Sequence, residues 1–180
     1  FTGYQASVDT FGAFGFQIDS NFSSSDSAAF RINAMYESLN NHRDFFDGDR
    51  FGVNPTARFE LSPATTLDLS YEYVDHQRFI DRGIPRGADG RPVEEFADIV
   101  FGDPELNSTE LQAHILRASL QHDFSDNLKG VFSAFYGDYD KLYSNFFVSN
   151  YDQAATPDVV TLDGYIDTTK RENLILSGNL

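Results

Sequence analysis

The residues from which catalysis or zinc binding would have to start are few and scattered. The four histidines are His42, His76, His114 and His122, and no H-x-x-x-H or H-E-x-x-H spacing joins any two of them. There is no cysteine and no G-x-S-x-G turn that would carry a nucleophilic serine. The sequence therefore excludes thiol chemistry, disulfides and Cys-based zinc sites, and it offers no acyl-transfer site.

Carboxylates are abundant, with 28 acidic residues against 13 basic ones and a formal net charge of -15. With so many acids, close pairs arise by chance, so an acid/base glycosidase rests on weak grounds. Asp47 with Asp49 and Asp138 with Asp140 could converge on calcium, although solvated acidic loops have the same pattern. The charge argues against nucleic acid, whose phosphates require Lys and Arg.

Aromatic residues are the best candidates for binding, because the chain has 18 Phe and 9 Tyr and many lie in polar connecting segments. Exposed aromatic side chains lower solubility unless they pack or bind something. Packing of loop against loop is the alternative to binding. The aromatic residues of these segments are Phe45, Phe46, Tyr143, Phe146, Phe147, Tyr151 and Tyr165.

The elements that must position these side chains are strands. In the segment from Phe51 to Leu61 the odd positions are mainly apolar and the even positions are polar or small. Because alternate side chains of a strand point to opposite faces, each such segment has one apolar and one polar face. This alternation predicts eight strands at about Thr2–Thr10, Phe14–Phe22, Ala28–Leu39, Arg50–Leu61, Thr66–Arg78, Thr109–Phe124, Leu128–Asp140 and Thr169–Leu180.

The connections between these strands are alternately short and long. Short turns are predicted at Ser23–Ser27, Ser62–Thr65 and Ser125–Asn127, and long loops at Asn40–Asp49, Phe79–Ser108 and Lys141–Thr168. Short turns at one rim and long loops at the other are typical of an outer-membrane β-barrel. No apolar run approaches the roughly 20 residues of a membrane helix. The sixth strand changes its apolar face near Ile115, which predicts either a bulge or a strand that leaves the membrane.

Several short stretches, in this order, resemble TonB-dependent siderophore receptors of the ferrichrome and ferric-hydroxamate type. They are Arg43-Asp-Phe-Phe-Asp-Gly-Asp-Arg50, Leu61-Ser-Pro-Ala-Thr-Thr-Leu-Asp-Leu-Ser-Tyr-Glu-Tyr73, Arg82-Gly-Ile-Pro85, Phe101-Gly-Asp-Pro104 and His122-Asp-Phe-Ser-Asp-Asn-Leu128. The resemblance implies an all-β, antiparallel up-and-down meander that belongs to a 22-stranded transmembrane barrel. Residues 1–180 would be a partial barrel domain, without the plug and the remaining strands.

The resemblance also implies a function. The parent protein would lie in the outer membrane of a Gram-negative bacterium, in contact with lipid and lipopolysaccharide, and would import a ferric siderophore with energy from TonB through the plug. It would need no cofactor and no protein ligand to the metal, because the iron arrives inside its chelator. The siderophore-binding residues expected from this are Arg78, Phe79, Asp81, Arg82, Phe45, Phe46, Tyr143, Phe147 and Tyr165.

Other interpretations remain open at this point. The chain could belong to a porin or to an importer of sugars or cobalamin, or it could be a soluble all-β carbohydrate-binding module whose apolar faces pack against a second sheet. An acid/base hydrolase rests only on the abundant carboxylates. On the polar faces, we expect Arg31, Arg58, Glu37, Glu60 and Glu72 to form a ladder of charges across neighbouring strands or to touch the plug.

Overall fold

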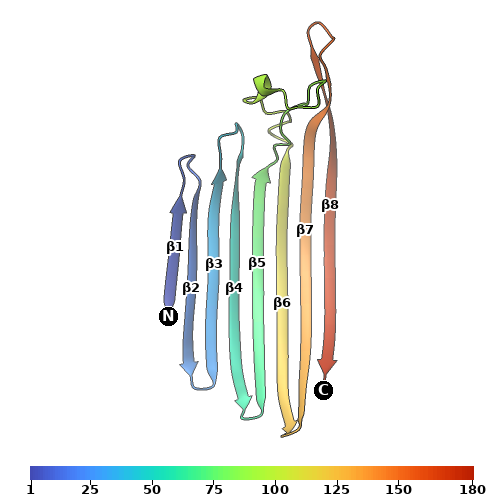
Figure 1. Cartoon of the computed structure of the whole chain (residues 1–180). Coiled ribbons are helices and arrows are strands. Elements are labelled where there is room, and N and C mark those ends of the chain that lie inside the picture. Colours follow the sequence, from blue (N-terminus) through green and yellow to red (C-terminus); the bar gives the residue numbers. More distant parts are fainter.

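The computed structural model describes all 180 residues as one antiparallel sheet in which every strand pairs with its neighbours in the sequence (Figure 1). The eight-stranded up-and-down meander expected from the alternation is thus confirmed. The strands are β1 (Thr2–Val8), β2 (Phe14–Ser25), β3 (Ala28–Asn40), β4 (Asp47–Ser62), β5 (Thr65–Phe79), β6 (Ser108–Ser125), β7 (Leu128–Asp152) and β8 (Val159–Asn179). The single helical element is the 3-10 turn η1 (Glu94–Phe96), and no helix is long and apolar enough to cross a membrane.

The short turns and the longer connections lie at opposite rims of the sheet, as predicted (Figure 1). The turn rim carries the connections at 26–27, 63–64 and 126–127. Next to each of these turns the pairing register shifts by one residue, which marks a bulge. The loop rim carries the long segment 80–107 and the connections at 9–13, 41–46 and 153–158.

The prediction of a long loop over Lys141–Thr168 is wrong. β7 continues to Asp152 and β8 begins at Val159, so most of that segment is a hairpin that projects beyond the other strands (Figure 1). Its many aromatic residues suit strands as well as binding loops, and they obscured the alternation. Only residues 153–158 connect the two strands.

One face of the sheet, here called the apolar face, is apolar across the middle of its strands. The register aligns Phe22, Phe30, Ala57, Leu69, Ala118, Ala134 and Leu176 in one row across seven strands. No second layer of this chain covers that row, and Leu69 remains 39% exposed. A soluble sandwich formed by this chain alone would bury these side chains, and no second sheet of this chain does so. An uncovered apolar face of this size must meet another apolar medium.

The opposite face, here called the polar face, carries the expected ladder of charges. Arg58 lies opposite Asp68 at 2.7 Å, and Arg31 reaches Asp19 at 2.6 Å. The remaining cross-strand ion pairs of this face are Arg50–Glu37, Arg117–Glu72, Lys129–Asp123 and Lys141–Asp167, while Glu60 has no such partner. These pairs are partly exposed and screened by solvent, so they mainly reinforce the register.

The sixth strand contains no bulge near Ile115, so that part of the expectation is wrong. β6 pairs regularly with β5 and β7 from Ser108 to Asp123. Instead, the apolar face becomes polar toward the loop rim, because His114 aligns with Asp138 and Glu172. At this level Ala113 is buried on the polar face. The structure therefore agrees with the alternative, in which the strand rises out of the apolar band.

Candidate ligand-binding site

A cluster of aromatic side chains surrounds one arginine at the loop rim, on the polar face of the projecting hairpin. Tyr143, Asn145 and Phe147 alternate along β7 and therefore share a face, and the register places Tyr165 of β8 opposite Asn145. Arg82, from the segment that follows β5, reaches this group. Strand periodicity thus assembles one wall of the site, and the long loop supplies the cation.

The contacts of Arg82 are all with neutral groups. Its Nη1 donates to Asn145 Oδ1 at 3.2 Å and, over a longer distance of 3.5 Å, to the Tyr143 hydroxyl. Its Cζ lies 4.9 Å from the centre of the Phe147 ring, a cation–π contact. The hydroxyls of Tyr165 and Tyr143 raise the pKa of Arg82 above its ordinary value, so the side chain stays charged.

The aromatic rings of this cluster also hold one another. Tyr143 and Tyr165 are stacked, with ring centres 5.8 Å apart, and Phe147 meets Tyr165 edge to face at 6.2 Å. Such pairs contribute about 0.5–1.5 kcal/mol each beyond the area they bury. The cluster is therefore a preformed aromatic surface with a fixed positive charge at its edge. Chemically, it can hold an anion that also has a flat or apolar part.

Unpaired positive charge is concentrated beside this cluster. Of the 13 basic side chains, eight form ion pairs. Four of the other five lie between residues 78 and 91; they are Arg78, Arg82, Arg86 and Arg91. In a chain with a net charge of -15, this segment is the place where an anion meets positive charge that no carboxylate neutralises.

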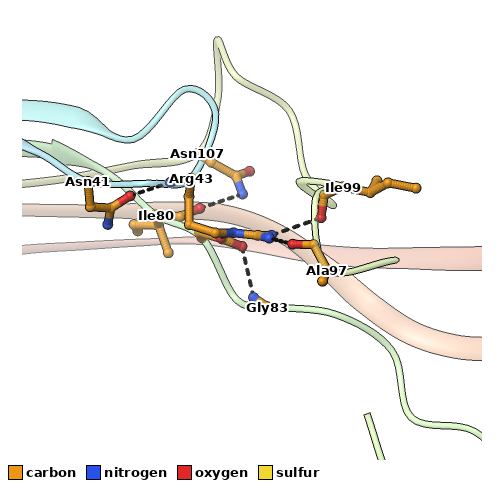
Figure 2. Close-up of polar contacts among 8 residues, drawn as sticks. Asn41, Arg43, Ile80, Gly83, Ala97, Ile99 and Asn107 are labelled. Carbon is orange, nitrogen blue, oxygen red and sulfur yellow. Dashed lines mark hydrogen bonds and ion pairs between the residues drawn. The ribbon is translucent and has the colours of Figure 1, made fainter. Parts of the chain in front are cut away.

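Arg43, in the connection between β3 and β4, holds the long loop in place (Figure 2). Its Nε donates to Asp81 Oδ2 at 2.6 Å, its Nη2 donates to the Ile99 carbonyl at 2.8 Å, and its Nη1 donates to the Ala97 carbonyl. The side chains of Arg43 and Asp81 are only 14% and 11% exposed. Asp81 also accepts the N–H of Gly83, which forms the turn before Arg86. Asp81 is thus engaged in fixing the loop.

Asn107 is the second anchor of the loop, and its side chain is fully paired although it is only 2% exposed. Its Nδ2 donates to the carbonyls of Ile80 at 3.0 Å and Phe146 at 2.9 Å. Its Oδ1 accepts from the N–H of Phe146 at 2.7 Å and of Asp103 at 3.3 Å. One amide therefore joins both ends of the loop to β7. Gly102 permits this approach, because a Cβ there would lie 2.3 Å from Asn107 Nδ2.

The structure brings together four of the nine residues expected to bind ligand: Arg82, Tyr143, Phe147 and Tyr165. Phe79 is buried at 5% exposure and packs near Phe45, which is 60% exposed. Phe46 is half-buried in the neighbouring connection, and Arg78 is half-buried at the end of β5. Neither of these two contacts the cluster in a hydrogen bond or ring pair.

Three residues of this region were not among the expected ones: Asn145, Asn107 and Arg43. Asn145 lies between Tyr143 and Phe147 at strand spacing, so the alternation could have found it had this segment been assigned to a strand. No local signal marks Asn107 or Arg43, because all their side-chain partners except Asp103 are 27 to 56 residues away. The calcium alternative finds no support: no three His, Asp or Glu side chains are placed to share a metal, and Asp140 pairs with Lys170.

Comparison with known proteins gives a consistent picture. No protein-family model matches the chain. The metal-pseudopaline receptor CntO of Pseudomonas aeruginosa PAO1 is 31% identical over 100 residues, which are 54% of this chain and 14% of the receptor. The probable TonB-dependent siderophore receptor PiuA of Acinetobacter baumannii is 30% identical over 93 residues, or 48% of this chain and 12% of that receptor. The matched part is thus about a seventh of the curated relatives' length.

The solved structures of the ferric-catecholate import receptor Fiu of E. coli K12 have the same fold. The open form superposes with a TM-score of 0.76 over 98% of this chain and 29% of that one, at 21% identity. The closed form gives a TM-score of 0.75 over 98% and 27%. The chain is similar to receptors for siderophores and metal complexes. None of these names specifies a hydroxamate, so the narrower likeness to ferrichrome receptors stays a prediction.

Proposed function

We propose that this chain forms part of the wall and mouth of an outer-membrane receptor of a Gram-negative bacterium, which binds a metal–siderophore complex at the loop rim and imports it. The observation that carries the proposal is the cluster of Arg82 with Tyr143, Phe147 and Tyr165 at that rim. The meander fold and the named receptors among the relatives support it. These relatives are transport receptors, and we propose no catalytic role.

The charges at the rim favour an anionic complex over a neutral one. Ferric iron fully chelated by singly charged hydroxamates is neutral, whereas iron chelated by doubly charged catecholates stays anionic. Arg82 is held by neutral partners, and Arg78 and Arg86 make no ion pair, so their charge is available to a ligand. Arg82 and Arg86 are exposed at the loop rim, where their charges contribute both attraction and orientation. We therefore favour an anionic chelate over the ferric hydroxamate expected from the resemblance.

The proposed mechanism assigns one task to each part of the sheet. The apolar face contacts membrane lipid, and lipopolysaccharide surrounds the chain near the loop rim. The aromatic cluster contacts the flat groups of the chelator, while the arginines contact its negative charge. The metal stays inside its chelator, so the protein need not provide metal ligands. Release into the polar interior would depend on a plug and on TonB, which the resemblance to the family implies.

The test compares ligands and variants in the whole receptor that contains this chain. Affinities for a ferric catecholate and a ferric hydroxamate would be measured by fluorescence quenching in detergent, and uptake would be followed with radioactive iron. Arg82→Gln should weaken binding of the catecholate about tenfold, as expected for the loss of one charge-assisted contact. Lys170→Gln, which removes an equal charge from the outward side of β8, is the matched control.

Two results would contradict the proposal at different levels. Equal affinity of the Arg82→Gln and Lys170→Gln receptors for every chelate would show that the cluster is not the binding site. Tight binding of the hydroxamate together with no binding of the catecholate would leave the receptor function intact but would refute the argument from charge.

A further inference from the structure

One edge of β7 has no neighbouring strand where the hairpin projects beyond the sheet. The pairing of β6 with β7 ends at Ser108 and Ser144, whereas β7 continues to pair with β8 as far as Asp152. No backbone hydrogen bond from the loops reaches residues 145–152 on the open side. Both neighbours of β7 in the sheet, β6 and β8, are already in place. The unpaired edge therefore arises because β7 extends beyond β6 at the loop rim, and not because β7 lacks a neighbouring strand.

Asn107 shows that this edge can accept a pairing partner. Its side-chain amide both donates to the carbonyl and accepts from the N–H of Phe146. Those are the two bonds that a residue of an antiparallel neighbour would exchange at this position. Asn107 immediately precedes β6, so its side chain continues the ladder by one step. Beyond that step the edge has no backbone partner.

A recess lies along the rest of this edge. One wall is formed by residues 147–154 and the other by residues 82–88, and the space between them is about 790 Å³. The recess is bounded at one end by the contact of Arg82 with Asn145 and at the other by the hydrogen bond from the Ala88 N–H to Gln153 Oε1 at 3.1 Å. From Phe147 to Asp152 the strand spans roughly 17 Å, the length of a peptide of about five or six residues.

The charges and shape of the recess restrict the partner. Its cations are Arg82 and Arg86, its only acid is Asp152 at the outer end, and Arg86 forms no ion pair. Acidic side chains on the partner would therefore be favoured. The bulge at Ser149 interrupts regular pairing, which protects the edge from long strands and confines a partner to a short segment.

We propose that this recess binds a short, extended acidic peptide that adds a strand to the edge of β7 between Phe147 and Asp152. Backbone hydrogen bonds along β7 would hold the peptide, and Arg86 would contact one of its carboxylates. The recess shares Arg82 and Phe147 with the aromatic cluster, but peptide binding would use the backbone edge of β7 and would need no metal complex.

The test uses a fluorescent hexapeptide of alternating Glu and Val and measures its anisotropy with the whole receptor in detergent. We expect saturable binding that falls about tenfold in Arg86→Gln, the loss of one charge-assisted hydrogen bond. A peptide that is N-methylated at every residue keeps the charge but lacks all N–H donors, and it should not bind. A peptide with Lys in place of Glu should bind more weakly.

Two outcomes would overturn the proposal. Absence of saturable binding at millimolar peptide would show that the recess takes no added strand. Equal binding of the N-methylated peptide would show that charge alone attracts it. Hydrogen exchange supplies an independent measurement, since those amides of residues 148–152 that face the open edge should exchange more slowly only in the presence of the unmethylated peptide.

Discussion

Replacing Asn107 should release the long loop at the rim while leaving the sheet paired. Asn107→Ala removes four hydrogen bonds, two given by Nδ2 and two received by Oδ1. Each neutral bond contributes about 1 kcal/mol net, and a buried group left without a partner costs about 1–3 kcal/mol. Water reaches some of these groups once the loop moves, so we expect a loss of about 3 kcal/mol for opening of the loop. That corresponds to more than a hundredfold faster hydrogen exchange.

Hydrogen–deuterium exchange of the amides of Ile80, Asp103 and Phe146 measures this effect directly in the whole receptor. Asn107→Asp is the informative companion variant, because it keeps the accepting oxygen but turns a carboxylate toward two carbonyls, and it should open the loop at least as much. Asn127→Ala, at an exposed short turn on the opposite rim, is the matched control. If Asn107→Ala changed the exchange of these amides no more than the control does, the argument that one side chain anchors the loop would be refuted.

Three further predictions follow from other parts of the chain. Leu69→Arg places a charge in the middle of the apolar face and should destabilise the membrane-inserted receptor by about 2–4 kcal/mol, whereas Ser70→Arg on the polar face should be tolerated. Urea titration of the two receptors folded into bilayers compares their stabilities. Equal stability would mean that the apolar face does not meet lipid. Arg43→Met leaves the nearly buried Asp81 without its partner and should make the loop susceptible to trypsin at Arg91. The double variant Arg43→Met with Asp81→Leu should regain part of the resistance to trypsin. An unchanged digestion pattern would show that the ion pair does not hold the loop. The hydrogen bond to Asp158 raises the pKa of Tyr151 in the folded protein. The stabilising effect of this bond is therefore complete below the ordinary tyrosine pKa of about 10 and is lost as the pH rises through the higher pKa of the folded state. Proteolysis at residues 153–158 should increase in strong alkali in the wild type, and Tyr151→Phe should abolish that pH dependence.

The prediction of the strands succeeded where local order alone decides the structure. A period of two residues places side chains on alternate faces whatever the neighbouring strand is, so Phe59, Leu67 and Leu69 could be assigned to one face from the sequence. The turns at Ser62–Thr65 and Ser125–Asn127 were found because small and polar residues interrupt the alternation there. The projecting part of β7 was missed, since its aromatic residues suit either a strand or a binding loop.

The candidate site was predicted in part, because its members come from two kinds of segment. Tyr143, Phe147 and Tyr165 stand out as aromatic residues in polar surroundings, and Arg82 lies in a stretch that resembles the family. Their convergence depends on the register of β7 with β8, which pairs Asn145 with Tyr165 and which no local pattern specifies. Phe79 and Asp81 were expected in the site because, like Arg82, they lie where the fifth strand enters its long loop. The structure instead buries Phe79 and pairs Asp81 with Arg43.

The sequence by itself determined the alternation of the strands, the two faces of the sheet and the separation of short turns from longer connections. These properties depend on residues that are close together in the chain. The tertiary structure alone decided which strand positions face each other, that β7 projects beyond β6, and that Asn107 and Arg43 hold the loop beside the aromatic cluster. Apart from the bond to Asp103, the side-chain contacts of Asn107 and Arg43 join residues 27 to 56 positions apart, and such distant partners are chosen by register and packing, which a local pattern does not record.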